Sequence, residues 1–305
     1  MKKIFVVACF SATLMLIGSC DQNDSSGQEE SMFGLKRIPV VVHVIHNGEP
    51  VGTGPNISYE QVVSQIAVLN EDFRRKAGTN GSNNLPDGVD CEIEFYLAET
   101  DPQGNVLAEP GVHRYNGGRD SWPKGAVLNP IDNLIKPVTI WTPEAYFNIW
   151  TVNFGGFLSR DLLGYAQFPS NSTLPGLNAD GGSAETDGIV IGYQYFGSSE
   201  KGNFPELFVP FDLGRTTTHE VGHWLGLRHI WGDGDCFVDD YCEDTPTAAA
   251  PNFGCSANVS CSSADMIENY MDYTDDGCMN IFTYDQKVRM HTVLQNSPRR
   301  KELVD

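Results

Sequence analysis

The chain has 305 residues, 40% of them hydrophobic and only 20% charged, which is enough for one sizeable core or for two subdomains around a cleft. Its 40 acidic and 20 basic side chains give a formal net charge of −20. This charge argues against nucleic acids and anionic lipid surfaces as partners, and leaves cations and basic substrates.

The N-terminus has the form of a secretory signal peptide. Two lysines follow the first Met, an apolar run extends to Ile17, and Gly18-Ser19-Cys20 then provides a lipobox-like cleavage site. We expect residues 1–19 to be the signal peptide, Cys20 to be lipidated, and residues 20–36 to form a lipid anchor and a flexible polar tether. The alternatives are a signal peptide cleaved elsewhere and a short membrane anchor, although the run is shorter than the ~20 residues that span a bilayer.

The following segments predict a twisted sheet with a helix behind it. Apolar runs at 40–45, 92–98, 147–154 and 188–191 indicate strands. Ser58-Tyr59-Glu60-Gln61 forms a capping box before an amphipathic helix that runs to Phe73. Residues 163–167 resemble the edge strand of a sheet, against which an extended substrate would pair. Four histidines lack a metal spacing with one another and are interpreted as structural or surface residues: His43, His46, His113 and His291.

The most specific motif runs from His219 to His229 and reads His-Glu-Val-Gly-His-Trp-Leu-Gly-Leu-Arg-His. His219 and His223 share one face of a helix, so their ring nitrogens can reach one ion. Glu220 lies beside that ion, where it can deprotonate a water molecule as a general base. Gly226 can end the helix in the left-handed conformation and turn the chain so that His229 reaches the same ion. Three neutral imidazoles with one open coordination position are typical of a catalytic zinc.

An acidic loop and a methionine follow this motif. Residues 232–245 carry six carboxylates, a density of hard oxygen ligands that suits calcium, although the ligand order is not that of an EF-hand and a solvated loop is the alternative. Met271 stands where a metzincin places the methionine turn beneath its zinc, although an ordinary core methionine would give the same sequence. Thr283-Tyr284-Asp285-Gln286 caps a last helix that runs toward Gln295.

These features resemble the pappalysin family of metzincin peptidases, and the resemblance extends from about residue 36 to 297. It implies an α+β fold: a twisted, mostly parallel sheet with a backing helix and a zinc helix, in two subdomains around a cleft. The catalytic domain would span residues 37–300, with the upper part ending at about residue 229. Besides the zinc motif, four segments carry the resemblance in order: Asp244-Thr245-Pro246, Asn269-Tyr270-Met271-Asp272-Tyr273, Cys278-Met279-Asn280 and Phe282-Thr283.

The resemblance also implies roles for residues outside the zinc motif. Tyr273 would stabilise the oxyanion of the tetrahedral intermediate, although a buried structural tyrosine is the alternative. Structural calcium (Ca²⁺) would be bound by Asp240, Asp244 and Thr245.

Eight cysteines include Cys9 and Cys20 near the N-terminus, and the other six suit disulfides in an oxidising compartment. A cysteine zinc cluster is disfavoured because no paired Cys-x₂-Cys spacing is present. The family layout implies two disulfides, Cys236–Cys261 and Cys255–Cys278. Cys91 and Cys242 are left as a guessed third pair, in which Cys242 stands where the family has a small apolar residue.

The sequence therefore predicts a zinc-dependent (Zn²⁺) metalloendopeptidase in which Glu220 and the metal activate water. We expect a monomer that binds a protein or peptide substrate as an extended strand. It would be exported across the inner membrane of a bacterium and act as a lipoprotein of the cell envelope or surface, with the membrane contacted only through the N-terminal anchor. The alternative is a catalytically silent binding protein or adhesin on the same fold, against which the intact Glu220 argues.

Overall fold

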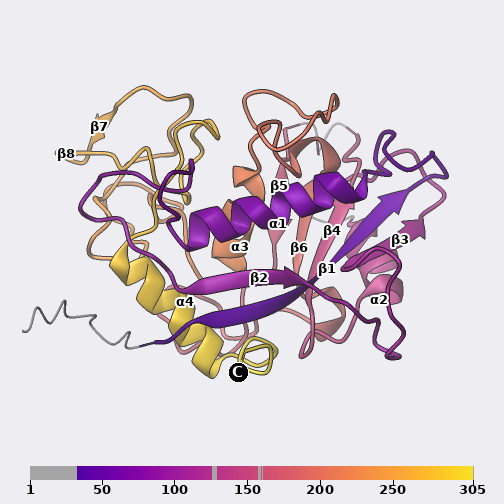
Figure 1. The fold of residues 1–305 in the computed structure, drawn as a ribbon. Coiled ribbons are helices and arrows are strands. Elements are labelled where there is room, and N and C mark those ends of the chain that lie inside the picture. Colours follow the sequence, from indigo (N-terminus) through magenta and orange to yellow (C-terminus); the bar gives the residue numbers. More distant parts are fainter. Residues whose placement is uncertain (1–32, 126–128, 157–158, 160, 305) are drawn as a thin grey trace, which may run out of the picture. The chain divides into compact units, whose positions relative to one another are not determined.

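A six-stranded sheet organises the chain in this computed structural model (Figure 1). The structure describes residues 33–125, 129–156, 159 and 161–304, so the predicted signal peptide, Cys20 and most of the tether lie outside the described residues. Among the described residues, no helix has the length and apolar character needed to cross a membrane. The strands are β1 (Lys36–His46), β2 (Ile93–Leu97), β3 (Val112–Asn116), β4 (Phe147–Val152), β5 (Gly164–Ala166) and β6 (Ile189–Gly192).

The sheet is parallel apart from one edge. Its order is β2-β1-β4-β6-β5, with β3 also paired to β1, and only β5 runs antiparallel to its neighbour β6. A separate small hairpin pairs β7 (Val259–Ser260) with β8 (Ser263–Ala264). The helices are α1 (Tyr59–Phe73), α2 (Lys136–Thr139), α3 (Arg215–Trp224) and α4 (Tyr284–Asn296), and short helical turns are η1 (Ile131–Ile135), η3 (Ala184–Thr186) and η4 (Tyr193–Tyr195). The predicted mixed fold with a mostly parallel sheet is confirmed.

Strand β1 lies inside the sheet because both of its faces are apolar. Val40, Val42 and Val44 are fully buried in the main core, which α1 and α3 also join. The alternate residues Val41 and Ile45 pack into two smaller clusters, as expected from the two-residue period of a strand. The predicted strand at 40–45 is thus present and extends at both ends.

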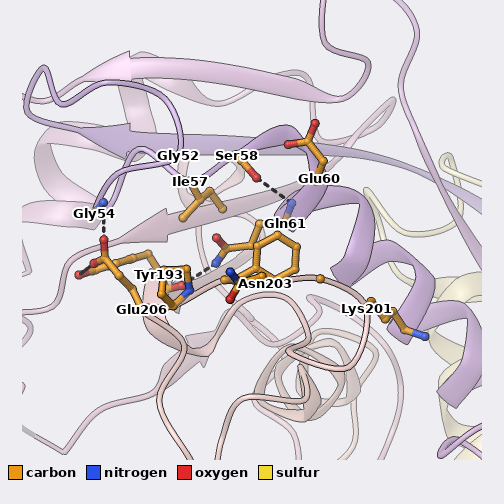
Figure 2. A pocket seen from close by; sticks show the side chains of 13 residues that line it. Gly52, Gly54, Ile57, Ser58, Glu60, Gln61, Tyr193, Lys201, Asn203 and Glu206 are labelled. Carbon is orange, nitrogen blue, oxygen red and sulfur yellow. Dashed lines mark hydrogen bonds between the residues drawn. The ribbon is translucent and has the colours of Figure 1, made fainter.

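Helix α1 starts at the predicted cap residue, Ser58, and runs alongside β2 (Figure 1). The Ser58 side chain caps it by accepting a hydrogen bond from the backbone N–H of Gln61. The other half of the predicted capping box is not formed, because the Gln61 side chain is directed to the segment after β6, where its amide donates to the carbonyl oxygen of Phe196. Figure 2 shows this helix start beside the carboxylate of Glu206, which accepts a hydrogen bond from the Tyr193 hydroxyl at 2.8 Å and lines a cavity of about 420 Å³.

A buried carboxylate at the end of α1 fixes helix α3. Asp72 accepts hydrogen bonds from the Thr218 hydroxyl at 2.7 Å and from the Arg215 guanidinium at 3.3 Å. All three side chains are buried. Because an unpaired charge in the interior is costly, this pairing fixes α3 relative to α1 and the sheet.

Helix α4 is the last helix of the chain. Its predicted capping box is present, with Thr283 and Gln286 bonding each other's backbone N–H groups. Gln286 also exchanges hydrogen bonds with the side chain of Asn269, at 3.0 and 3.1 Å. The helix start is therefore attached to the turn that contains Met271.

Two disulfides staple the segment between α3 and α4. They are the pairs predicted from the family layout, Cys236–Cys261 and Cys255–Cys278.

The guessed third pair is wrong, because Cys91 and Cys242 are free and buried. Cys91 lies in the main core, where its carbonyl oxygen accepts a hydrogen bond from His291. Cys242 lies in the acidic loop, where its N–H donates to Asp240. Burial raises the pKa of both thiols, so each behaves as a small core residue.

Candidate active site

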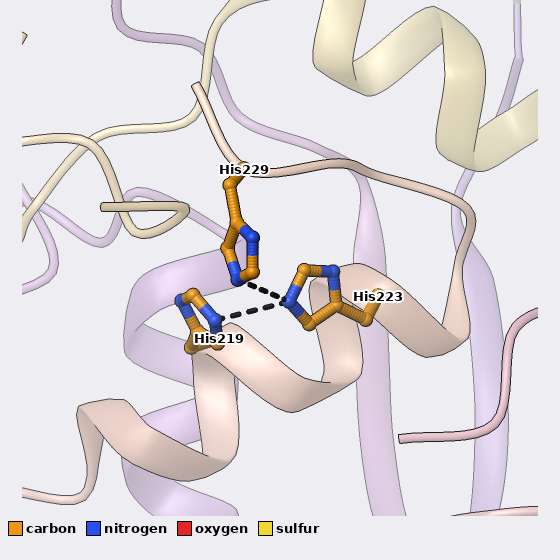
Figure 3. A group of neighbouring side chains, drawn as sticks. All are labelled: His219, His223 and His229. Atoms are coloured by element: carbon orange, nitrogen blue, oxygen red, sulfur yellow. Dashed lines mark hydrogen bonds between the residues drawn. The ribbon is translucent and has the colours of Figure 1, made fainter. Parts of the chain in front are cut away.

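Three histidine rings converge at the end of α3 (Figure 3). His219 and His223 lie on successive turns of the helix, and His229 returns to them after the helix has ended. The Nε2 atom of His223 lies 3.1 Å from that of His219 and 3.0 Å from that of His229. In the part of the chain that the structure describes, this is the one cluster of three or more His, Cys, Asp or Glu side chains placed to hold a metal ion.

Hydrogen bonds to the opposite ring nitrogens orient the first two imidazoles. The Nδ1 atom of His219 lies 2.7 Å from the carbonyl oxygen of Tyr270, and that of His223 lies 2.8 Å from the carbonyl oxygen of Leu227. A carbonyl oxygen only accepts, so each Nδ1 carries the proton and each Nε2 presents a lone pair. Burial lowers the pKa of both rings, that of His223 to about 3, and keeps them neutral.

The donor set fits zinc. The Nε2 lone pairs face one another, an arrangement that a cation stabilises. In a tetrahedral zinc site with Zn–N bonds of about 2.0–2.1 Å, neighbouring nitrogens lie roughly 3.3 Å apart. The separations of 3.0 and 3.1 Å are close to that value.

Two glycines shape the chain around these ligands. Gly226 has the left-handed conformation predicted for it, with φ of +91°, and this ends the helix so that His229 can return. Gly222 makes room below the helix, because a Cβ atom there would lie 2.4 Å from the sulfur of Met271.

The turn around Met271 therefore lies directly beneath α3. Met271 is fully buried, and its N–H donates to the Asn269 side chain at 2.9 Å. Its carbonyl oxygen accepts a hydrogen bond from Ile230 at 3.3 Å, next to the third histidine. Because His219 is bonded to Tyr270 in the same turn, this turn supports the histidines from below.

Glu220 and His219 line a cavity of about 420 Å³. The walls of this cavity come from segments on both sides of α3 in the sequence, with Leu163 before it and Tyr273 and Met279 after it. Among the described residues, none makes a hydrogen bond to the Glu220 carboxylate. Burial raises its pKa to about 8, and a bound dication would oppose that shift. Gly164 allows the close approach, since a Cβ atom there would lie 2.9 Å from Cγ of Glu220.

Tyr273 lies at the edge of the same cavity. Its ring centroid is 5.6 Å from that of His219 and 4.9 Å from that of His229, and the residue is 39% exposed. Burial, together with the negative charges of Glu220 and Asp233, raises its pKa to about 12. The phenol is therefore protonated at neutral pH and can donate a hydrogen bond.

A second cavity, of about 630 Å³, follows the edge strand β5. Tyr165 and Ala166 of β5, together with Phe168, Arg228 and Asp233, contribute to its lining. Because β5 is the last strand in the sheet order, its outer edge is unpaired within the described sheet. Residues 163–167, which the sequence weakly indicated as an edge strand, thus contain an edge strand next to the histidines.

The acidic loop brings together some of the predicted calcium ligands. The Asp240 carboxylate is buried and accepts a hydrogen bond from the Thr245 hydroxyl at 2.7 Å. Asp244 uses one oxygen to accept a hydrogen bond from the Asp285 N–H, and its other oxygen is buried without a partner.

Sequence reasoning missed three neighbours of the site. Trp231 stacks on His229 with ring centroids 4.2 Å apart and an interplanar angle of 5°. Asp233 accepts a hydrogen bond from Nδ1 of His229. Gly164 packs on Glu220 from the sheet edge. Of these three neighbours, only Asp233 could have been suspected from the sequence, because it follows His229 by four residues.

Comparisons with known proteins agree with this geometry. The family model described as Pregnancy-associated plasma protein-A matches residues 132–295. Extracellular metalloprotease 1 of Coccidioides posadasii is 42% identical over 277 residues, covering 87% of this chain and 81% of the relative. An extracellular metalloprotease of Verticillium alfalfae is 30% identical over 260 residues, covering 84% and 74%.

A solved structure is similar over nearly its whole length. It is the mature mirolysin of Tannerella forsythia in complex with a cleaved peptide, with a TM-score of 0.70 and 38% identity, covering 88% of this chain and 96% of that one. The chain therefore belongs to the Pregnancy-associated plasma protein-A, or pappalysin, family and is a secreted zinc-dependent metalloendopeptidase.

Proposed function

We propose that this endopeptidase uses Glu220 as the general base that activates the attacking water. The supporting observation is that Glu220 lines the same cavity as His219, one of the three clustered histidines, and that its carboxylate has no hydrogen-bond partner among the described residues. When bound by these histidines, zinc would supply a Lewis acid for the water and for the scissile carbonyl. Glu220 accepts the proton of the water and passes it to the leaving amine.

Tyr273 is proposed to stabilise the negative charge that develops on the carbonyl oxygen. Its phenol is protonated at neutral pH and borders the same cavity. A hydrogen bond that strengthens as charge develops lowers the barrier, and loss of one such donor typically costs about 10²- to 10³-fold in kcat. Tyr273→Phe should therefore lower kcat by about this factor and leave zinc binding intact.

The substrate is proposed to bind as an extended strand along β5. The outer edge of β5 offers unpaired backbone groups beside a cavity that is also lined by Asp233, the hydrogen-bond partner of His229. The cavity at Glu220 is also lined by Asp161, Asp272 and Asp276, whereas its one arginine, Arg215, is paired with Asp72. This balance of charge favours peptides with basic side chains.

The test of the general base compares wild type, Glu220→Ala and Glu144→Ala on an unbiased peptide library, with cut sites read by mass spectrometry and zinc content by elemental analysis. Glu144 is an exposed glutamate before β4 and serves as the control. We expect Glu220→Ala to retain zinc and lose cleavage, while Glu144→Ala cuts like wild type. Undiminished cutting by Glu220→Ala would refute the mechanism. No cutting by zinc-loaded wild type would instead favour the binding-protein or adhesin alternative.

Structural calcium is proposed for the acidic loop. Asp240, Thr245 and the unpartnered oxygen of Asp244 supply hard oxygen ligands within six residues. We expect added calcium to raise the Tm of wild type and to have a smaller effect on Asp244→Asn. An equal effect on both proteins would exclude Asp244 as a ligand.

Membrane attachment through Cys20 is proposed from the lipobox-like sequence alone. Metabolic labelling with a fatty acid should mark wild type and fail to mark Cys20→Ala. Size-exclusion chromatography of the Cys20→Ala protein would test the proposed monomer, which should elute at the size of a single chain.

A further inference from the structure

His229 is oriented differently from the other two zinc-site histidines. The Nδ1 atoms of His219 and His223 donate to backbone carbonyl oxygens, which are neutral. The Nδ1 atom of His229 donates instead to the carboxylate of Asp233, four residues later. This residue is the only carboxylate hydrogen-bonded to the three rings in the described part of the chain.

We propose that Asp233 is a positioning residue that holds His229 for zinc and strengthens its binding; this inference rests on the proposed zinc function. A carboxylate that accepts a hydrogen bond from an imidazole fixes its tautomer and makes the opposite nitrogen a better electron donor to a metal. Trp231 fixes the plane of the same ring by stacking on it. Asp233 therefore restricts the remaining motion of the His229 ring, which is its rotation within that plane.

The backbone around Asp233 is arranged to deliver this carboxylate. Asp233 has a left-handed φ of +62°, which few side chains tolerate and which Asp and Asn adopt most readily. Arg228 donates to the carbonyl oxygen of the preceding Gly232 and lies 3.6 Å from the second carboxylate oxygen. The same arginine lies 5.8 Å from the centroid of the Tyr241 ring, which anchors the far side of the loop.

Two substitutions separate the charge of Asp233 from its hydrogen bond. Asp233→Asn keeps an oxygen that accepts from Nδ1 and keeps a residue suited to the left-handed backbone, but it removes the charge. Asp233→Gly removes both and leaves the backbone unstrained. Asp235→Asn is the matched control, since it makes the same charge change in the same loop on an exposed side chain that accepts only from the N–H of Phe237.

The measurement is the zinc dissociation constant by competition with a chromophoric chelator, for each full-length protein at one pH. Loss of such a supporting carboxylate typically weakens metal binding by about 10- to 100-fold. We expect that loss for Asp233→Gly, a smaller one for Asp233→Asn, and no change for Asp235→Asn. The visible spectrum of the cobalt-substituted protein should shift in the two Asp233 variants and not in the control.

Thermal unfolding separates this role from a general effect on folding. A structural role would lower Tm equally with and without zinc, whereas a positioning role reduces the rise in Tm that zinc produces. Zinc affinities within twofold of wild type in both Asp233 variants, with an unshifted cobalt spectrum, would overturn the inference. In that case wild type still binds zinc and cleaves peptides, so the proposed function stands. A wild type that binds no zinc would overturn both.

Discussion

Replacing Gly164 by Ala tests whether the sheet edge sets the position of Glu220, the proposed general base. A Cβ atom at this position would lie 2.9 Å from Cγ of Glu220, 3.0 Å from a methyl carbon of Ile191 and 3.0 Å from the carbonyl oxygen of Val190. The methyl group can rotate away, but the carbonyl belongs to the paired strand β6. The glutamate must therefore move.

The size of that movement sets the expected loss of activity. Ordinary contact begins at 3.4 Å, so Cγ of Glu220 must retreat from 2.9 Å by about 0.5 Å or more. A misplacement of about 1 Å can cost roughly 10²-fold in rate. We expect kcat/KM to fall by about 10- to 100-fold, which is about 1.4–2.7 kcal/mol in the barrier. Zinc content should not change, because the three atoms nearest to the added Cβ belong to Glu220, Ile191 and Val190 and not to a histidine.

The assay measures kcat/KM on one cleaved peptide, with zinc content and Tm for the same preparations. Gly277→Ala is the matched control, since a Cβ atom there meets nothing within 4 Å and its φ is not positive. Overpacking alone can cost about 1–3 kcal/mol of stability, so the Tm shows whether the variant is folded at the assay temperature. A folded Gly164→Ala protein with kcat/KM within twofold of wild type would refute the reasoning.

Two further predictions concern stability. Asp72→Ala should lower the free energy of unfolding by about 3–5 kcal/mol, because it leaves the buried Arg215 without its ion-pair partner. The control Glu71→Ala should cost about 1 kcal/mol or less, because the ion pair between Glu71 and Lys201 is partly exposed. Equal losses of the two variants in denaturant titrations would contradict this prediction. Burial raises the pKa of Asp276 from 3.8 to about 6, so its protonated form stabilises the fold fully below about pH 4 and that contribution is lost as pH rises through about 6. The stability of wild type minus that of Asp276→Asn should therefore fall by up to about 3 kcal/mol between pH 4 and pH 7, and a flat difference would contradict the shift.

The parts of the site that local geometry determines were predictable from sequence. The helical period places His219 and His223 on one face, and only a residue such as Gly226 readily takes the left-handed turn that returns His229. The β-branched run at 40–45 likewise requires a strand buried on both faces, which is what β1 provides. Family resemblance supplied the position of Met271, whose burial under α3 no periodicity could indicate.

The parts that depend on tertiary contact were not predictable. Gly164 reads as an ordinary strand glycine until Glu220 is packed against it. Strand β3 (Val112–Asn116) was missed because its burial is only partial and its polar residues give no clear alternation. The pairing of Cys91 with Cys242 failed because counting cysteines says nothing about where each side chain is buried.

The two hydrogen bonds from His219 and His223 to main-chain carbonyl oxygens have an evolutionary consequence. Every residue carries a carbonyl group, so changes of side chain at Tyr270 or Leu227 leave these two acceptors chemically the same while the chain keeps its course. Only His229 depends on an acceptor that a single codon change can remove, at Asp233. Among enzymes that share this fold, inherited differences in metal retention should therefore concentrate at that position, which also makes it the place to tune chelator resistance by design.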